Sequence, residues 1–331
     1  MTKRFLASVI ILAAALAGPV GAETLRDRLY DPAGDVLVVA HRACHRPAPS
    51  RGFEQPVPEN SLSALERCVA LGVDLVEIDV RRTRDGHLVV MHDAKVDRTT
   101  DGRGRISGLT LAQIQALRLK DGAEPPPTLE AMLTAARGRI LVNIDLKGPH
   151  AAQAAEIARR VDAADWVLFK ARAGLGAPPI ADQPPYQDLA FMPMVAGKAA
   201  RRPAGLGRIT ARQASGERQI PAVEMVALKR QGFVAVRDAA RAARIRVWTN
   251  TLAEKGWRGV LDQSGDRKAL RDPHGAWGRL IAQGVSIIQT DYPATLLDYL
   301  ERRGLRGPAS IAVADARSPA PASSAVSSTS R

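Results

Sequence analysis

Short apolar runs alternate along the chain with longer segments in which apolar residues recur every three or four positions. Residues 36–40 are apolar throughout, which is typical of a parallel strand buried on both faces. Further strands are predicted at residues 75–80, 140–146, 166–169, 189–194, 223–226, 245–249 and 285–290. Helices are predicted at residues 62–71, 129–136, 151–161 and 236–243. An additional extended segment, residues 88–91, follows the second strand.

This alternation of strand and helix predicts a parallel α/β protein. The count of eight strands favours a closed (β/α)8 TIM barrel. A doubly wound open sheet is the alternative, but no glycine-rich nucleotide loop follows the first strand. We therefore expect one barrel domain over residues 27–306.

Both ends of the chain differ in composition from this body. Lys3 and Arg4 precede the apolar residues 5–16, and small residues follow up to Ala22. This pattern predicts a secretory signal at residues 1–22, cleaved after Ala22, and hence a periplasmic or secreted protein. An uncleaved membrane anchor is the alternative. Residues 307–331 are rich in Ala, Ser and Pro, which predicts a disordered tail.

Composition narrows the class of protein. The 331 residues are 46% apolar and 24% charged, which excludes a disordered chain, a coiled coil and a multi-span membrane protein. The net charge of +13 suits an anionic small-molecule substrate or peripheral contact with an anionic membrane, although a solvated basic surface would have the same charge. Aromatic residues make up only 4%, which argues against nucleic-acid binding. No obligate protein partner is indicated.

The chain has two cysteines, Cys44 and Cys68, and their spacing fits no zinc motif. In an oxidising compartment two cysteines can pair. The sequence leaves open whether they form a disulfide or remain separate thiols.

Acidic side chains occur at the carboxyl ends of the predicted strands, where the active sites of barrels lie. Glu77 and Asp79 alternate with apolar residues, so they face the same side of their strand, about 7 Å apart. Asp145 lies near the end of the next strand. Three carboxylates facing one interior repel each other, and a divalent Mg²⁺ or Ca²⁺ would remove the conflict. Structural pairing with arginines is the alternative.

Basic side chains and imidazoles occur at the same strand ends. Arg42 and Lys147 could bind an anionic oxygen, and His41 and His92 could divide the roles of general acid and general base. These residues together predict a metal-dependent enzyme that acts on an anionic substrate. They do not identify that substrate.

Five segments in order resemble the glycerophosphodiester phosphodiesterase family. They are His41-Arg42, Pro58-Glu59-Asn60-Ser61, Glu77-Ile78-Asp79-Val80, Val89-Val90-Met91-His92-Asp93 and Asn143-Ile144-Asp145-Leu146-Lys147. Similar segments occur at residues 127–130, 247–249 and 290–291. The resemblance implies a TIM barrel with a small insertion after strand 2. It also implies hydrolysis of glycerophosphodiesters to sn-glycerol 3-phosphate and an alcohol.

Carried over by position, the resemblance implies a role for eight residues. It implies an acid–base pair of His41 and His92, and substrate or phosphate contacts by Arg42, Lys147 and Trp248. It further implies metal ligation by Glu77, Asp79 and Asp145. A related lysophospholipid, phosphoinositide or sugar phosphodiesterase, a glycosidase using two carboxylates, and a non-catalytic binding protein are the rival functions.

The chain departs from the family pattern in three places. Ala43 stands where the family often has Gly, so we expect its backbone to avoid positive φ. Asp145 stands where the family usually has Glu, so its ligation is direct or through water. Residues 43–57 are longer than usual and are expected to cover the rim. Glu59 in the following segment is a further metal ligand, a hydrogen-bonding group or part of a helix entry.

Overall fold

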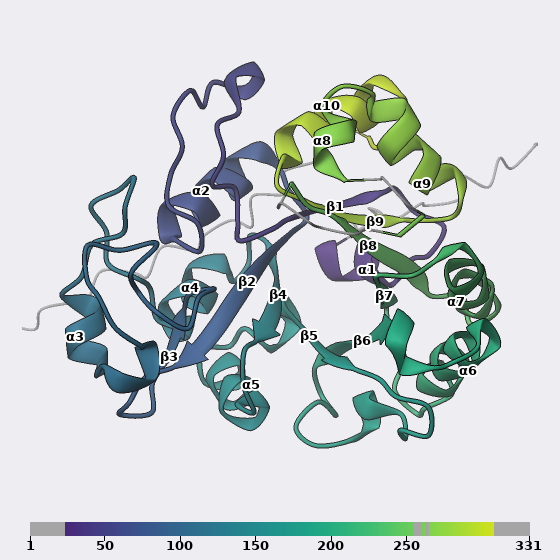
Figure 1. The fold of residues 1–331 in the computed structure, drawn as a ribbon, viewed down its shortest axis with the longest axis horizontal. Coiled ribbons are helices and arrows are strands. Elements are labelled where there is room, and N and C mark those ends of the chain that lie inside the picture. The colour runs from purple at the N-terminus through teal and green to yellow at the C-terminus, as the bar shows by residue number, and fades with distance from the viewer. Residues whose placement is uncertain (1–23, 254–259, 262–264, 308–331) are drawn as a thin grey trace, which may run out of the picture.

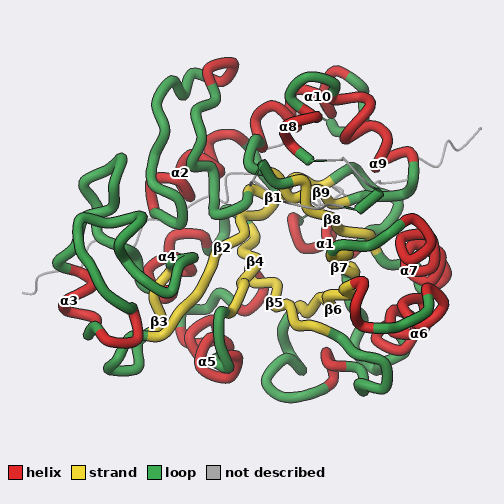
Figure 2. The backbone as a smooth tube through the Cα atoms, viewed as in Figure 1, coloured by secondary structure: helices red, strands yellow, loops and turns green. Residues whose placement is uncertain are grey.

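The computed structural model describes residues 24–253, 260–261 and 265–307. Eight parallel strands close into a barrel, because β1 pairs with β9 on one side and with β2 on the other. Figure 2 shows these strands as a ring. The barrel strands are β1 (Leu37–Ala40), β2 (Leu75–Arg82), β4 (Leu141–Leu146), β5 (Val167–Arg172), β6 (Ala190–Ala196), β7 (Ala222–Val226), β8 (Arg246–Thr251) and β9 (Ile287–Thr290). The predicted TIM barrel is confirmed.

Helices surround the barrel and cover the outer face of the sheet (Figure 1). The described helices are α1 (Leu25–Tyr30), α2 (Leu62–Leu71), α3 (Leu111–Gln115), α4 (Leu129–Ala136), α5 (Ala151–Arg160), α6 (Pro203–Ala214), α7 (Arg230–Ala242), α8 (Asp266–Ala269), α9 (Arg279–Ala282) and α10 (Pro293–Arg302). Among the described residues, none of the helices has the length and apolar character needed to cross a lipid bilayer.

The small insertion expected after the second strand is also present. It runs from the end of β2 to the start of α4 and includes β3 (Leu88–Val90), which pairs antiparallel with β2. Five buried residues give it an apolar cluster of its own: Val89, Met91, Val96, Ile106 and Ile114. In Figure 1 this insertion, which includes α3, lies beside the barrel. It places residues 91–93 against the carboxyl end of β2, since Met91 donates its backbone N–H to Asp79.

Alternation within each strand separates two apolar layers. In β2, Val76, Ile78 and Val80 point outward and pack against the helices. Side chains that point inward fill the lower part of the barrel, and they include Trp248 of β8. Leu29 of α1 joins this inner cluster, so α1 closes the amino-terminal end of the barrel. The inward-facing acidic residues Glu77, Asp79 and Asp145 lie above this layer, towards the carboxyl ends of their strands.

A disulfide joins the segment after β1 to the helix that follows it. Cys44 and Cys68 are bonded, with their Cα atoms 5.2 Å apart. Of the two possibilities left open by the sequence, the structure contains the disulfide. It anchors the beginning of the segment 43–57, which projects beside α2 (Figure 1). The predicted signal, residues 1–22, and the predicted tail beyond Gly307 lie outside the described residues.

Candidate active site

Three carboxylates converge at the carboxyl-terminal end of the barrel. Glu77 and Asp79 lie on β2 and Asp145 lies on the neighbouring β4, where Asp79 and Asp145 are register partners. One oxygen from each of the three lies within 4.8 Å of the others. Glu77 and Asp79 are each only 1% exposed. Oxygen ligands at this separation suit a hard divalent cation.

Two lysines lie against these carboxylates. The Lys147 ammonium lies 2.7 Å from Asp79 Oδ1 and 2.8 Å from Asp145 Oδ2. Lys170 of β5, which is almost fully buried, lies 3.7 Å from Asp145 Oδ2 and 3.9 Å from Glu77 Oε1. In the described part of the chain, lysines rather than arginines provide most of the structural pairing with these carboxylates. Among the arginines, Arg42 places its Nε 3.5 Å from Asp79 Oδ2.

The crowding perturbs the three acidic groups in different directions. Burial and the neighbouring Asp79 raise the pKa of Glu77 to about 7. Burial would also raise the pKa of Asp145, but Lys170 and Lys147 outweigh it and lower that pKa to about 2. The same balance, here with Lys147 as the main cation, lowers the pKa of Asp79. The raised pKa means that the charged form of Glu77 is unfavourable in this site. A bound divalent cation would stabilise that charged form, so the residues fit a metal.

Two imidazoles flank the carboxylates. His41 directly follows β1, is 6% exposed, and its pKa is raised partly by the charge of Glu77. His92 follows β3, has a side chain that is 35% exposed, and contributes to lowering the pKa of Asp79. The two histidines come from different segments and meet at one group of acidic residues.

Each imidazole is held by a carboxylate at the same ring atom. His41 Nδ1 lies 2.8 Å from Asp291 Oδ1, and His92 Nδ1 lies 2.7 Å from Asp93 Oδ1. Asp93 is held in turn by Arg98, whose Nε donates to it at 2.7 Å. Because Nδ1 is engaged in both rings, Nε2 is the atom that each histidine presents for proton transfer.

Arg42 contributes both its backbone and its guanidinium. Its N–H donates to Glu77 Oε2 at 3.2 Å, and its Nη1 donates to Glu59 Oε1 at 3.4 Å. Glu59 also accepts hydrogen bonds from Arg98. Of the roles considered for Glu59, the structure shows that of a hydrogen-bonding group, which links Arg42 to the segment after His92.

The prediction that Ala43 avoids positive φ was wrong. Arg42 and Ala43 adopt φ values of 54° and 63°, in the left-handed region that L-residues rarely occupy. Tertiary contacts hold this turn: the Ala43 N–H donates to the Glu77 carbonyl, and Cys44 is bonded to Cys68. The sequence showed the missing glycine but not these restraints.

The sequence of this chain is similar to those of known proteins. A model of the glycerophosphoryl diester phosphodiesterase family matches residues 51–295. The chain belongs to this family. It is 41% identical over 118 residues to glycerophosphodiester phosphodiesterase of Caldanaerobacter subterraneus, a stretch covering 34% of this chain and 45% of that protein. It is 39% identical over 143 residues to human glycerophosphodiester phosphodiesterase 1, covering 40% of each. The matches thus span less than half the length of these relatives.

Solved structures agree with the barrel fold. A glycerophosphoryl diester phosphodiesterase from Parabacteroides distasonis superposes with a TM-score of 0.63 at 22% identity, covering 84% of this chain and 91% of that one. A phosphodiesterase from Oleispira antarctica, solved with the product sn-glycerol-3-phosphate, gives 0.55 at 20% identity, covering 81% and 97%. At these identities the likeness concerns the fold of the phosphodiesterase family.

Several polar residues of this family member were not assigned a role from the sequence. Asn60 donates its side-chain N–H to Asp79 Oδ2 at 2.9 Å, whereas Ser61 alone caps α2. Asp291 orients His41. Lys170 and Glu224 are charged residues inside otherwise apolar strands, and that interruption is the signal that could have revealed them.

Trp248 occupies a deeper position than the other residues implied by the family resemblance. Its indole is fully buried among the inner apolar side chains, and its N–H donates to Asn250 Oδ1 at 2.8 Å. It therefore forms part of the floor beneath the polar layer and supports Asn250. Its direct contact with substrate stays a prediction.

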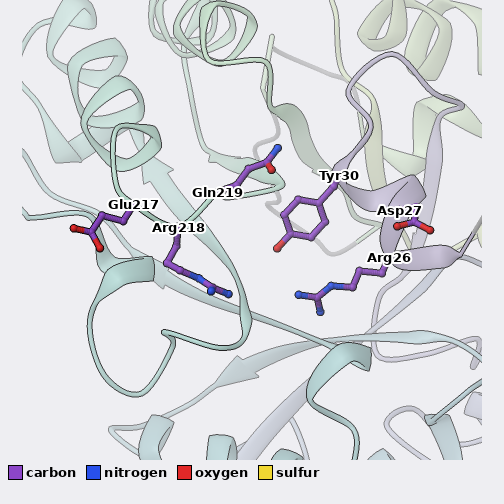
Figure 3. A pocket seen from close by; sticks show the side chains of 6 residues that line it. All are labelled: Arg26, Asp27, Tyr30, Glu217, Arg218 and Gln219. Carbon is purple, nitrogen blue, oxygen red and sulfur yellow. The ribbon is translucent and has the colours of Figure 1, made fainter.

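A separate hollow of about 380 Å³ lies at the opposite end of the phosphodiesterase barrel (Figure 3). It is formed by α1 and by the segment before β7, and is lined by Arg26, Asp27, Tyr30, Glu217, Arg218 and Gln219. It shares no residue with the carboxylate site.

Substituting Asp291 by asparagine is expected to change stability in a limited pH window. Burial would lower the pKa of His41, but its hydrogen bond to Asp291 outweighs burial and raises that pKa above 6.5. Burial would raise the pKa of Asp291, but His41 outweighs it and lowers that pKa below 3.8. The histidine's contribution is present below pH 6.5 and is lost as pH rises; the aspartate's is present above pH 3.8 and is lost as pH falls. The free energy of unfolding should therefore drop most between these values, by about 1–3 kcal/mol.

Urea unfolding of the wild type and Asp291→Asn across pH measures this difference. An equal difference from about pH 4 to about pH 9 would contradict the coupling between the two groups.

Proposed function

We propose that the protein hydrolyses glycerophosphodiesters to sn-glycerol 3-phosphate and an alcohol. The observation that carries the proposal is the placement of His41 and His92 beside a single group of three carboxylates. Membership of the phosphodiesterase family supports it. So does a relative in fold that was solved with the product sn-glycerol-3-phosphate.

Glu77, Asp79 and Asp145 would hold a divalent Mg²⁺ or Ca²⁺ ion. When bound, the cation supplies stabilisation of the negative charge that develops on the phosphoryl oxygens. Asn60 holds Asp79 in place through its side-chain amide, and Lys147 holds Asp79 and Asp145 together. The ligand oxygens are therefore oriented before any cation arrives.

The two histidines would move the protons of the reaction. In the first step, one Nε2 takes the proton of the glycerol hydroxyl next to the phosphate, and that oxygen attacks phosphorus. The bond from phosphorus to the alcohol oxygen breaks, and the other imidazolium gives that oxygen its proton. In the second step the roles reverse: water opens the cyclic phosphate, losing one proton to a histidine, while the glycerol oxygen regains one.

Arg42 and Lys147 would bind the phosphate during these steps. Arg42 is placed beside Glu59 and Asp79, and about a fifth of the Lys147 side chain is exposed at the mouth of the barrel. Two cations on the phosphate oppose the charge that builds up as the hydroxyl attacks.

A panel of diesters tests the proposal. Glycerophosphodiesters, a lysophospholipid, a phosphoinositide headgroup and a sugar phosphodiester would be incubated with the purified enzyme and Mg²⁺ or Ca²⁺. The expected result is release of sn-glycerol 3-phosphate from the glycerophosphodiesters, measured by an enzyme-coupled assay. Hydrolysis of only the other diesters would identify a different phosphodiesterase on this scaffold, and hydrolysis of none of the diesters would reject the phosphodiesterase.

We further propose that the enzyme acts after export, in the periplasm or outside the cell, where peripheral contact with an anionic membrane would suit its charge of +13. The bonded pair Cys44–Cys68 supports this, because disulfides persist in oxidising compartments. Mass spectrometry of the protein from the producing cells should show a first residue of Glu23. A retained Met1 would contradict cleavage.

A further inference from the structure

Lys170 and Glu224 lie inside the barrel beside the metal-binding carboxylates, and the proposed chemistry gives them no role. The Lys170 ammonium lies 3.7 Å from Glu224 Oε2 and 3.7 Å from Asp145 Oδ2, farther than a hydrogen bond. Glu224 Oε1 accepts from the Asn250 amide at 2.9 Å, but Oε2 has no hydrogen-bond partner among the described residues. Glu224 is 1% exposed, so this oxygen has neither a protein partner nor bulk water.

An unpaired oxygen at this depth is costly, because burial removes the water that would otherwise hydrogen-bond to it. Here the unpaired acceptor lies opposite the Lys170 ammonium, whose distances to the oxygens of Glu77, Asp145 and Glu224 are 3.9, 3.7 and 3.7 Å. The gap of 3.7 Å is too long for a direct hydrogen bond. A small group lying to one side of the pair, about 2.8 Å from each atom, could hydrogen-bond to both.

We propose that Lys170 and Glu224 form a subsite for one hydroxyl group of the glycerol part of the substrate. This inference rests on the proposed function and adds to it the residues that select the polyol. A hydroxyl donates one hydrogen bond and accepts others, so it can donate to Glu224 Oε2 while it accepts from Lys170. An ionised phosphate oxygen accepts only, and Glu224 would repel it.

The position of the pair indicates which hydroxyl it takes. Lys170 lies 3.9 Å from Glu77 Oε1 and 3.7 Å from Asp145 Oδ2, so the pair borders the carboxylates proposed to hold the cation. The proposed chemistry already assigns the attacking hydroxyl to a histidine and the phosphate to Arg42 and Lys147. The subsite therefore takes the remaining glycerol hydroxyl, the one that neither attacks nor carries the phosphate.

A pair of substrates that differ in this hydroxyl tests the subsite. One is the 4-nitrophenyl diester of sn-glycerol 3-phosphate, and the other is the matching diester of propane-1,2-diol 1-phosphate, which keeps the attacking hydroxyl and the leaving group. We expect the wild-type kcat/KM to favour the glycerol diester by about 10²-fold, because the diol lacks this hydroxyl and leaves both buried partners unpaired. In Lys170→Met and in Glu224→Gln the preference should fall below about 10-fold.

Met192→Leu is the matched control, since Met192 is the neighbour of Lys170 on β6 and packs in the inner apolar cluster of the barrel. It should keep the wild-type preference. An unchanged preference in Lys170→Met and Glu224→Gln would overturn the subsite.

The wild-type comparison stands even where a variant folds poorly. Equal kcat/KM for the two diesters would overturn the subsite but leave the proposed function intact. Hydrolysis of neither diester, with no 4-nitrophenol released, would instead overturn the proposed function and the subsite with it.

Discussion

Alanine at His41 or at His92 is expected to lower kcat at least ~100-fold, because each variant removes one of the two groups that transfer protons to and from the reacting oxygens. Both imidazoles are oriented through Nδ1, by Asp291 and by Asp93, so their loss removes a positioned Nε2 in each case. The measurement is the steady-state release of sn-glycerol 3-phosphate at saturating substrate.

Metal binding should persist in both variants, since neither histidine belongs to the trio of carboxylates. Calorimetric titration with Mg²⁺ or Ca²⁺ would show this and would separate lost chemistry from a lost site. His87→Ala is the matched control, because His87 lies in the turn between β2 and β3 and away from the carboxylates. A fully active double variant of His41 and His92 would reject the proton relay.

Removal of the divalent cation is expected to abolish activity. Without it, four carboxylates face two ammonium groups in the polar layer: Glu77, Asp79, Asp145 and Glu224 against Lys147 and Lys170. Arg42, 3.5 Å from Asp79, adds a third positive charge, and the remaining excess of negative charge is what a divalent cation would offset. Activity should fall to background in excess chelator and return when Mg²⁺ or Ca²⁺ is added in excess of the chelator.

Glu77→Gln provides the matched variant for the metal. It keeps the size of the side chain and removes one ligand charge, so the affinity for the cation should fall at least ~10-fold while the barrel stays folded. Circular dichroism would check the fold. Undiminished turnover of the wild type in excess chelator would show that the reaction does not need the cation.

Local signals in the sequence predicted parts of the fold closely. The helices at residues 62–71 and 129–136 were predicted with the ends that α2 and α4 have, because Ser61 and Thr128 cap them and Gly72 stops the first. The start of α7 was placed at residue 236 instead of Arg230. Its first turn has no capping side chain and contains Gly232, so nothing local marks the beginning.

The candidate site was predictable where the residues follow one another along the chain, and less so where partners come from distant segments. His41 and Asp291 are 250 positions apart, and only closure of the barrel between β1 and β9 brings them together. Lys170 sits between Phe169 and Ala171, and a single charge in an apolar run does not reveal which face of the strand it occupies.

The closed amino-terminal end of the barrel constrains the order of events in catalysis. Leu29 and Trp248 seal that end, so substrate enters, and both products leave, through the same mouth. In the proposed reaction, with the glycerol placed deepest, the alcohol would be the outer half of the diester, so it would depart first and the glycerol phosphate would follow. Retained glycerol phosphate would block this mouth and act as a competitive inhibitor of the next turnover.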